Sequence, residues 1–271
     1  MIYNTRKKIN SKGQLHNDNG PAVEYEDGTK EWWYNGKRHR IDEAAVIEND
    51  GGKEWWFFGI RHREDGPAII YPDGGEEWWY KGELHRMDEP AIKTLHGEEW
   101  FVNNKRHRVL GPAYIDYNKK IEYYINDELH REDGPAEIFL ENGEEKVRAW
   151  YINGYRHRED GPAVETTFGN EIWWNKGELH RMDGPAIKTL DGEEWFVNNK
   201  RHRLDGPAVI IKGKKMYYIR GIEYDRERYY KISNIVRKWC FKLLGKLKHK
   251  ISSLDFCRDI SNTVIKYSYK S

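Results

Sequence analysis

The stretch Gly59-Ile60-Arg61-His62-Arg63-Glu64-Asp65-Gly66-Pro67-Ala68 decides how this chain folds. With its neighbours it reads GIRHREDGPAIIYPDGGEEWWYK, and variants of that string recur nine times between Gly13 and Arg220. Successive histidines lie 22 or 23 residues apart, with one step of 27. A period of this size is typical of a repeat protein, in which each unit is stable only against its neighbours. The nine histidines of the signature are His16, His39, His62, His85, His107, His130, His157, His180 and His202.

Two irregularities show how the array varies. The 27-residue step contains an insertion around Glu144 to Arg148, where ENGEEKVRAW replaces a shorter DGGEEW. Residues 82–108 recur as residues 177–203, and the two copies differ only at Glu89/Gly184 and His96/Asp191. The array therefore grew by duplication of a block of repeats.

Each repeat contains two strand-like runs. The aromatic run Glu77-Trp78-Trp79-Tyr80 and the apolar run Ile69-Ile70-Tyr71 both favour strand. Asp73-Gly74 and its relatives accept positive φ and indicate a tight hairpin turn, whereas Gly and Pro recur too often for a helix. We therefore expect one antiparallel β-hairpin per repeat, and an all-β array in which the hairpins stack into an elongated, twisted sheet.

The paired aromatic positions of the repeats form two columns. Because neighbouring residues on a strand face opposite sides, one column should line each face of the sheet. The second column contains Trp33, Trp56, Trp79 and their equivalents, and the first should be the more buried because it holds only Trp or Tyr. The tryptophans of the first column, which we predict to be core residues, are Trp32, Trp55, Trp78, Trp100, Trp150, Trp173 and Trp195, and Tyr123 and Tyr217 complete it.

The chain divides into three parts. Residues 1–12 are predicted to be a capping half-repeat with Ile9 in the slot of the first aromatic, and residues 13–220 hold the nine repeats. In residues 221–271 the pattern changes, and Tyr224 takes the place of a histidine. A helical spacing of apolar residues then begins near Glu227 and predicts a helical cap. The apolar face comprises Ile232, Ile235, Val236, Trp239, Cys240, Leu243, Leu244 and Leu247, and a second, shorter helix is expected from Ser252 to about Ile265.

Charge is divided between these parts. Residues 222–271 carry 12 Lys and Arg against 5 Asp and Glu, whereas the remainder carries 34 against 40. A net acidic array opposes a phosphate backbone, so no nucleic-acid partner is expected. The basic helix could lie on an anionic membrane, dock into a partner's groove, or fold back to cap the sheet. The residues that would make a membrane or partner contact are Arg237, Lys238, Trp239 and Lys242.

We interpret the repeated His-Arg-x-Asp-Gly-Pro-Ala motif as a structural element that fixes the conformation of the loop. Asp65 can bond backbone amides or an arginine, Gly66 supplies freedom in φ, and Pro67 fixes φ where the next strand starts. The imidazole can stack on the neighbouring repeat or hydrogen-bond to it. Departures from the motif leave the array intact, as expected of distributed structural roles. The aspartates of this structural signature are Asp65, Asp133, Asp160, Asp183 and Asp205.

Other chemistries find less support. Equivalent histidines of successive hairpins should lie roughly 10 Å apart, too far to share one metal ion. No Gly-rich phosphate loop, nucleophile elbow or unique carboxylate pair stands out, so we predict no catalytic residue, metal site or cofactor. The two cysteines, Cys240 and Cys257, make no disulfide framework. The start of the chain has no secretory signal, and a cytoplasmic location, with a peripheral membrane site as the alternative, is the simplest expectation.

The repeats resemble a known family. Trp33-Tyr34-Asn35-Gly36-Lys37 and Trp79-Tyr80-Lys81-Gly82-Glu83 are similar to units of a MORN-repeat (membrane occupation and recognition nexus) variant. The His-Arg-x-Asp-Gly-Pro-Ala extension resembles a subgroup found in large DNA viruses of protists and in some bacteria and phages. The resemblance covers roughly residues 13–220. It implies an elongated β-hairpin ribbon that acts in scaffolding, protein–protein contact and phospholipid association, in the host cytoplasm if the protein is viral.

These observations favour a non-enzymatic repeat scaffold that presents an extended surface to a protein partner. The alternative is a peripheral phospholipid-binding module tethered by the basic C-terminal helix. Exposed sheet ends can also pair between copies, so self-association stays open.

Overall fold

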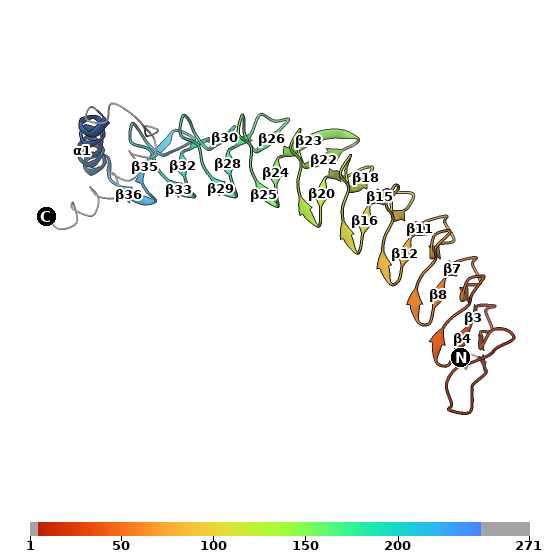
Figure 1. The fold of residues 1–271 in the computed structure, drawn as a ribbon. Helices are drawn as coiled ribbons and strands as arrows, with labels where there is room; N and C mark the ends of the chain where they lie inside the picture. The colour runs from red at the N-terminus through yellow and green to blue at the C-terminus, as the bar shows by residue number, and fades with distance from the viewer. Residues whose placement is uncertain (1–4, 245–271) are drawn as a thin grey trace. The chain divides into compact units, whose positions relative to one another are not determined.

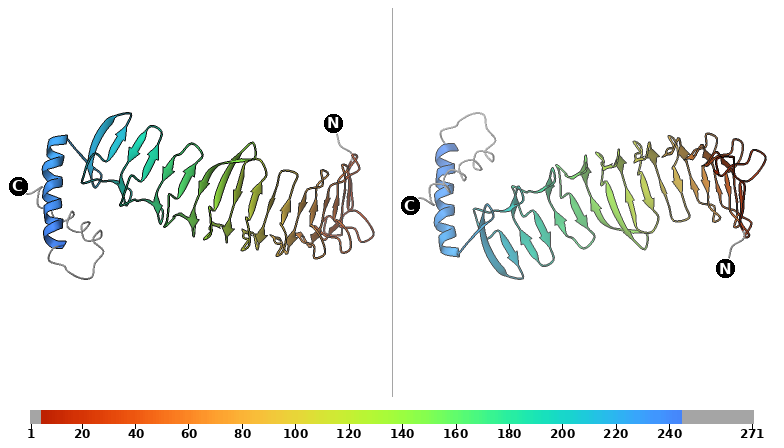
Figure 2. Two further views of the ribbon diagram at one scale, coloured as in Figure 1. Left: turned by 90° about the horizontal axis from the view of Figure 1, so that it is seen from above. Right: turned by 90° about the horizontal axis from the view of Figure 1, so that it is seen from below.

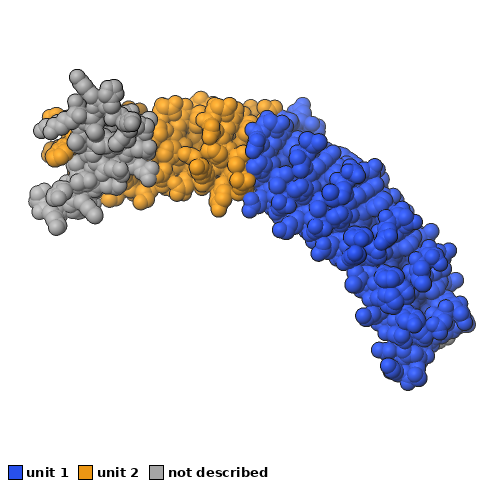
Figure 3. All heavy atoms as spheres, viewed as in Figure 1, with its two compact units in different colours: residues 1–145 blue, residues 146–271 orange. Residues whose placement is uncertain are grey.

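Antiparallel strands make up the repeats, and a helix follows them (Figure 1). The computed structural model describes residues 5–244, with side chains through Trp239. The chain forms two compact units, Met1–Glu145 and Lys146–Ser271 (Figure 3). The expected fold class, a β-hairpin array with a C-terminal helix, is confirmed.

In unit 1 each strand of the main sheet pairs antiparallel with the next along the chain. The strands are β1 (Arg6–Lys7), β2 (Val23–Glu24), β3 (Lys30–Glu31), β6 (Val46–Ile47), β7 (Lys53–Glu54), β10 (Ile69–Ile70), β11 (Glu76–Glu77), β14 (Ile92–Lys93), β15 (Gly97–Glu99), β18 (Tyr114–Asp116), β19 (Lys120–Glu122) and β22 (Glu137–Glu141).

Unit 2 repeats this pattern. Its main-sheet strands are β23 (Glu144–Ala149, which begins at the end of unit 1), β26 (Val164–Thr166), β27 (Glu171–Ile172), β30 (Ile187–Thr189), β31 (Gly192–Glu194), β34 (Val209–Ile211) and β35 (Lys214–Ile219). Strands β22 and β23, on either side of Asn142-Gly143, have five and six residues where most strands have two or three, and the insertion accounts for part of this length.

Each repeat contains a second, shorter hairpin, which the expectation of one hairpin per repeat missed. These hairpins stand in a row within each unit (Figures 1 and 2). Asn35 and Gly36 both have positive φ, 48° and 78°, as a type I′ hairpin turn requires. The pairs are β4 (Trp33–Tyr34) with β5 (Lys37–Arg38), β8 (Trp56–Phe57) with β9 (Ile60–Arg61), β12 (Trp79–Tyr80) with β13 (Glu83–Leu84), β16 (Phe101–Val102) with β17 (Lys105–Arg106), β20 (Tyr124–Ile125) with β21 (Glu128–Leu129), β24 (Tyr151–Ile152) with β25 (Tyr155–Arg156), β28 (Trp174–Asn175) with β29 (Glu178–Leu179), and β32 (Phe196–Val197) with β33 (Lys200–Arg201).

The alanine of the signature forms the deepest part of the core. In each repeat its side chain is at most 1% exposed, and its carbonyl accepts the backbone N–H of a first-column residue, as Ala45 does from Trp32 at 2.8 Å. The aromatic columns are half-buried, except that Trp100 is only 5% exposed. The expected difference in burial between the columns is therefore seen only at Trp100. The alanines are Ala22, Ala45, Ala68, Ala91, Ala113, Ala136, Ala163, Ala186 and Ala208.

At the N-terminus, Lys8 and Ile9 make the bonds of the two aromatic columns, one residue away from the expected assignment. The N–H of Lys8 bonds Ala22 C=O at 2.8 Å, the bond that a first-column residue makes elsewhere. Ile9 pairs with Leu15 and so takes the second-column slot. Ile9 was placed wrongly because this hairpin turn holds one residue more than the others.

The last repeat extends past Arg220. Strand β36 (Ile222–Tyr224) pairs with the end of β35, so residues 221–224 complete a short hairpin before the helix. Helix α1 (Arg226–Leu244) then begins, with Asp225 Oδ1 accepting the N–H of Arg228 at 2.9 Å as an N-cap. The second helix predicted from Ser252 lies outside the described residues.

Helix α1 caps the last repeat through Tyr229. Its side chain is fully buried, and its hydroxyl lies 2.8 Å from the carbonyls of Arg203 and Gly206. Its ring contacts that of Tyr217 at 4.9 Å. Ser233 and Val236 are buried one and two turns further along.

The predicted apolar face of α1 is only partly correct. Val236 is buried, but Ile235 and Trp239 are 47% and 54% exposed, because Tyr229 turns a different face toward the array. Among the residues that the structure describes, no helix is both long enough and apolar enough to cross a membrane.

Candidate functional site

The histidines of the signature link neighbouring repeats. At eight of them Nδ1 accepts the backbone N–H of a residue in the next short-hairpin turn. The donor and acceptor pairs are Asn35 and His16 (3.2 Å), Phe58 and His39 (3.3 Å), Lys81 and His62 (3.2 Å), Asn103 and His85 (3.3 Å), Asn126 and His107 (3.3 Å), Lys176 and His157 (3.4 Å), Asn198 and His180 (3.4 Å), and Arg220 and His202 (3.2 Å). The contact predicted between imidazole and neighbouring repeat is confirmed at these positions.

This bond fixes the protonation state of the ring. A backbone N–H can only donate, so Nδ1 is unprotonated and the proton of the neutral ring is on Nε2. At His85, His107 and His180 the side-chain amide of an asparagine also lies beside the ring, with Oδ1 2.8, 3.1 and 2.6 Å from Nδ1. An amide oxygen cannot donate to an unprotonated Nδ1, so the acceptor role of Nδ1 requires these amides to be turned with NH2 toward the ring.

Burial reinforces the neutral form. It lowers the pKa of His39, and at His202 burial, aided by the Arg220 charge, lowers the pKa to about 4. On the other ring nitrogen, Nε2 of His62 lies 3.7 Å from Glu64. The acid at this position of the motif thus lies on the Nε2 side of the ring.

The arginine of the signature lies over the first-column ring of its own repeat. Such a contact is a cation–π interaction, worth about 0.5–2 kcal/mol. The distances from Cζ to the ring centroid are 4.1 Å for Arg40 and Trp32, 4.1 Å for Arg63 and Trp55, 3.7 Å for Arg86 and Trp78, 3.8 Å for Arg108 and Trp100, 4.0 Å for Arg131 and Tyr123, 4.1 Å for Arg158 and Trp150, 3.9 Å for Arg181 and Trp173, and 3.8 Å for Arg203 and Trp195. In the last repeat, Tyr229 covers Tyr217 instead.

The rest of the motif holds this guanidinium. Arg63 Nε donates to Asp65 Oδ1 at 3.0 Å, and its NH1 donates to the carbonyl of Pro67 at 3.2 Å. A Cβ at Gly66 would lie 2.6 Å from Arg63 Cζ, and its φ is not positive, so the glycine makes room for the side chain and the predicted role in freeing φ is wrong. Similar Arg–Asp pairs occur at Asp133, Asp160, Asp183 and Asp205.

The Arg–Asp contact lowers the pKa of these carboxyls. At Asp65, Asp133 and Asp183 the leading cause is the arginine hydrogen bond. At Asp205 burial works in the opposite direction, but the bond to Arg203 still leaves the pKa lowered. The side chains of Asp65 and Asp133 are 84% exposed, so the ion pair itself adds little stability.

Repeats that depart from the motif replace its bonds. Glu43 and Glu89 stand in the glycine position and pair with Arg40 and Arg86. In the first repeat Asn17 takes the arginine slot, and its Nδ2 donates to Pro21 C=O at 2.8 Å.

Where Leu110 replaces the aspartate, Arg108 still lies over the Trp100 ring and still donates to Pro112 C=O at 3.1 Å. The ring contact and the carbonyl bond therefore matter more than the aspartate.

A second set of arginines lies beside the second aromatic column. Arg38 lies 5.4 Å from both Trp33 and Trp56, and its NH2 donates to Glu31 at 2.8 Å. The indole N–H of Trp33 donates to the same carboxylate at 2.7 Å. The two aromatic columns thus have separate partners.

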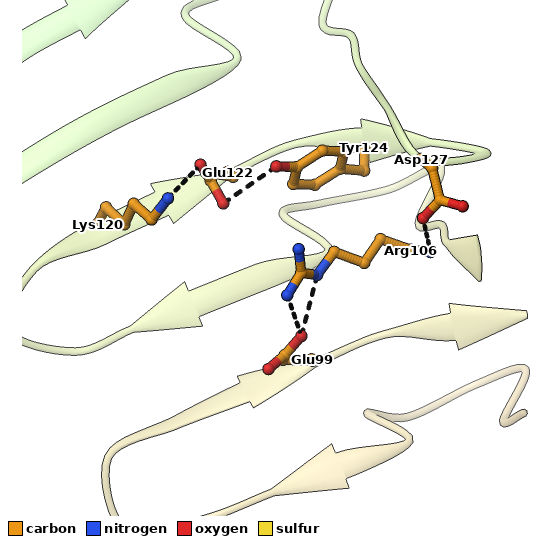
Figure 4. A network of polar contacts seen from close by, with 6 residues as sticks. All are labelled: Glu99, Arg106, Lys120, Glu122, Tyr124 and Asp127. Carbon is orange, nitrogen blue, oxygen red and sulfur yellow. Dashed lines mark hydrogen bonds and ion pairs between the residues drawn. The ribbon is translucent and has the colours of Figure 1, made fainter. Parts of the chain in front are cut away.

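Figure 4 shows the equivalent contacts three repeats further along. Arg106 donates to Glu99 through Nε and NH2, at 3.0 and 2.8 Å. Glu122 accepts from Lys120 at 2.7 Å and from the Tyr124 hydroxyl at 3.3 Å. Burial and the Glu122 charge raise the pKa of Tyr124 to about 12.

The signature side chains and the aromatic columns make their contacts inside the array. In the described part of the chain, no three His, Cys, Asp or Glu side chains gather in a way that could hold a metal ion. The signature residues recur at every repeat and do not converge on one place. The structure therefore brings together an arginine, an aromatic ring and the proline carbonyl in most repeats, and in five of them an aspartate as well, a geometry suited to holding the loop.

The predicted C-terminal contact residues lie on α1. Arg237, Lys238 and Trp239 are all exposed, and Trp239 lies one turn from the exposed Ile235. Lys242 belongs to α1, but its side chain is outside those that the structure describes.

Comparisons of the chain with protein-family models, curated proteins and solved structures gave no match. The resemblance to MORN repeats stays a prediction.

The first prediction separates the ring contact from the ion pair. Arg181→Ala should lower the free energy of unfolding by about 1–3 kcal/mol, because it uncovers Trp173 and leaves Pro185 C=O without its donor. Asp183→Ala should cost less than about 1 kcal/mol, because this carboxylate is largely exposed. Urea unfolding followed by circular dichroism measures both, with Lys238→Ala as the control. Equal losses for Arg181→Ala and Asp183→Ala would contradict this account.

The second prediction concerns pH. Because the pKa of folded His202 lies below its ordinary value of 6.5, acid protonates the unfolded chain first. The neutral imidazole of His202 therefore makes its full contribution to the free energy of unfolding above about pH 6.5. This contribution falls as the pH falls and is lost below about pH 4, with a total change of about 3 kcal/mol. His202→Asn keeps an acceptor that does not titrate and should flatten the loss of stability between pH 7.5 and 4.5 in urea unfolding.

His96→Asn is the matched control, since His96 is exposed and lies outside the signature. It should leave the pH dependence as it is in the unchanged chain. An unaltered pH dependence in His202→Asn would show that the His202 bond does not contribute.

Proposed function

We propose that this chain is a non-enzymatic repeat scaffold that presents its outer surface to a protein partner. The supporting observation is that the histidines, arginines and first-column rings are all used inside the array. A constant frame of this kind leaves other positions free to vary.

The positions that vary are exposed. The x position of the His-Arg-x-Asp motif carries Ile41, Met87 and Val109, whose side chains are 70–77% exposed, and Glu64 in another repeat. Charged and apolar residues thus both occur at this position of equivalent loops, and of these residues Leu204, in the last loop, is partly buried. Surface variation on a fixed frame is the usual basis of recognition in repeat proteins.

Selection from a displayed library of random 12-residue peptides against the full chain tests this function. We expect enriched peptides that protect backbone amides of the short hairpins in hydrogen exchange and that keep their mass after incubation. The heat-denatured chain is the control and should select none of them. Failure to enrich any peptide, or cleavage or modification of those bound, would refute the scaffold.

A second candidate function is attachment to an anionic membrane through α1. It is favoured by the exposed Ile235 and Trp239 beside the cationic Arg237 and Lys238. Amphipathic basic helices of this composition lie in the membrane interface.

Sedimentation of the full chain with phosphatidylserine-containing vesicles tests this attachment. The unchanged chain should pellet at low salt, and the double variant Ile235→Glu with Trp239→Glu should remain in solution. Leu190→Glu, which alters an exposed apolar residue elsewhere in unit 2, should behave like the unchanged chain. If the double variant pellets equally, or the unchanged chain does not pellet, α1 is not the anchor.

A further inference from the structure

The last main-sheet strand of unit 2 has an edge that no described strand covers. Residues 214–216 of β35 pair with β34 on one side, and only the end of β35, from Tyr217 on, pairs with β36 on the other. In earlier repeats the equivalent strand lies between two partners, as β31 does between β30 and β34. Among residues 5–244, the edge at Lys215 is therefore the place where a further strand of the sheet would lie.

The backbone groups at this edge point outward. Lys212 and Gly213 have positive φ, 48° and 79°, and form the two-residue turn between β34 and β35. The residues that flank such a turn form a hydrogen-bonded pair, and the next pair of the ladder, which includes Lys215, is not hydrogen-bonded. The N–H and C=O of Lys215 therefore point away from β34, toward the open side.

A hollow of about 590 Å³ lies beside this edge. Lys215 and its alternate neighbours Gly213 and Tyr217 line the hollow from the strand, and Asp225 and Arg226 line it from the start of α1. Successive residues of a strand alternate in direction, so the strand residues at the hollow are those whose backbone faces outward. Helix α1 therefore caps the last repeat without filling the space beside Lys215.

Strand β23 shows what fits such an edge. Among the described strands, only β23 and β35 have six residues, and Arg148 in β23 is equivalent to Lys215, since each lies two residues before the first-column ring. Strand β26 pairs with β23 and places Glu165 opposite Arg148. The same ladder continues with the N–H of Thr167 donating to Lys146 C=O at 3.0 Å. An acidic residue thus lies opposite the basic one in the closest internal precedent.

The charges at the hollow allow the same pairing. The two acids that line it already have partners, because Glu223 accepts the Tyr218 hydroxyl at 2.8 Å and Asp225 caps α1. The two cations, Lys215 and Arg226, are exposed, and neither has an ion pair with a described side chain. Opposite charges across neighbouring strands stabilise a sheet, so an acid opposite Lys215 would be favoured.

A second copy of the chain fits this edge less well. The side chains of β1, at the start of the sheet of unit 1, are Arg6 and Lys7, and β35 presents Lys214 and Lys215. Pairing β35 with β1 or β35 of another copy would bring like charges together. Such a contact destabilises a sheet, and basic edge strands are a known protection against pairing between copies.

We propose that the open edge of β35 takes up an extended segment of a partner protein as an additional antiparallel strand. The segment carries a β-branched apolar residue opposite Met216 and an acidic residue opposite Lys215. In strand addition, main-chain bonds provide affinity and the alternate side chains provide selectivity. This inference rests on the proposed scaffold function and names the class of partner segment that one part of the array binds.

Fluorescence anisotropy of a labelled Gly-Pro-Ala-Val-Glu-Thr-Thr peptide with the full chain tests the inference. The peptide copies residues 161–167, whose strand pairs with β23. The control peptide carries N-methylglutamate, which removes the N–H that faces Lys215 C=O and keeps the charge. We expect the unmodified peptide to bind at least about tenfold more tightly and to protect the Lys215 amide in hydrogen exchange. Equal affinities, or binding by neither peptide, would overturn the proposal.

A charge exchange tests the register of the added strand. Lys215→Glu should weaken binding of the Glu peptide at least about threefold and strengthen that of Gly-Pro-Ala-Val-Lys-Thr-Thr, because opposite charges then face each other again. The urea midpoint should not change, since Lys215 is exposed. Lys238→Glu makes the same change of charge on α1 and should bind both peptides as the unchanged chain does. Identical effects of the two variants would contradict the proposed register.

Two further outcomes identify which proposal fails. If sedimentation equilibrium shows that the full chain self-associates and excludes the peptide, a second copy occupies β35 and the strand-addition proposal falls. If the peptide selection described above enriches ligands of the short hairpins while Gly-Pro-Ala-Val-Glu-Thr-Thr does not bind, the scaffold stands and strand addition falls. If neither experiment yields a ligand, both fall.

Discussion

The bond from a turn amide to the imidazole of the preceding repeat is the contact on which the array depends. A single hairpin of two-residue strands cannot bury enough surface to be stable in water. Each repeat must therefore be fixed to the next one. At His62, for example, the Lys81 amide is received at 3.2 Å, and the same bond recurs in both units. Because the acceptor is Nδ1, each linking histidine has to be neutral.

The arginine over the first-column ring explains most of the remaining motif. The carbonyl at the proline and, where present, the aspartate hold the guanidinium, and a glycine beneath it makes room in most repeats. Repeats with Asn17 or Leu110 show that the set tolerates single losses, because the ring, carbonyl and backbone bonds are shared among several groups. Distributed bonds of this kind make the signature a structural device and leave recognition to the residues outside it.

Several features of the fold could be predicted from the sequence. The histidine spacing and the Asp-Gly turns predict the repeats and the main-sheet hairpins, and the apolar spacing after Glu227 predicts α1. The short hairpins were missed because their turns include Phe58-Gly59 and Lys81-Gly82, which do not read as turn signals. Side-chain stacking between Arg63 and Trp55 also has no signature in periodicity, since it depends on how the loop folds back.

Other errors have equally local causes. One additional turn residue displaced Ile9 from its expected slot. Ile235 and Trp239 fit the helical period as well as the buried residues do, and only the anchoring of Tyr229 decides which face packs. The alanine column could not be predicted as core from hydrophobicity, because a methyl group buries little apolar surface. Its side chains are nevertheless almost completely buried, where a larger side chain would not fit.

Nitrogen-15 NMR of the imidazoles at neutral pH tests the central claim most directly. The account predicts that His16, His62 and His202 and their equivalents have an unprotonated Nδ1 and a proton on Nε2, including His85 and His180, which face asparagine amides. Each unprotonated Nδ1 should also show scalar coupling to the amide of the next turn. Protons on Nδ1, or rings that are charged at neutral pH, would contradict the linkage between repeats.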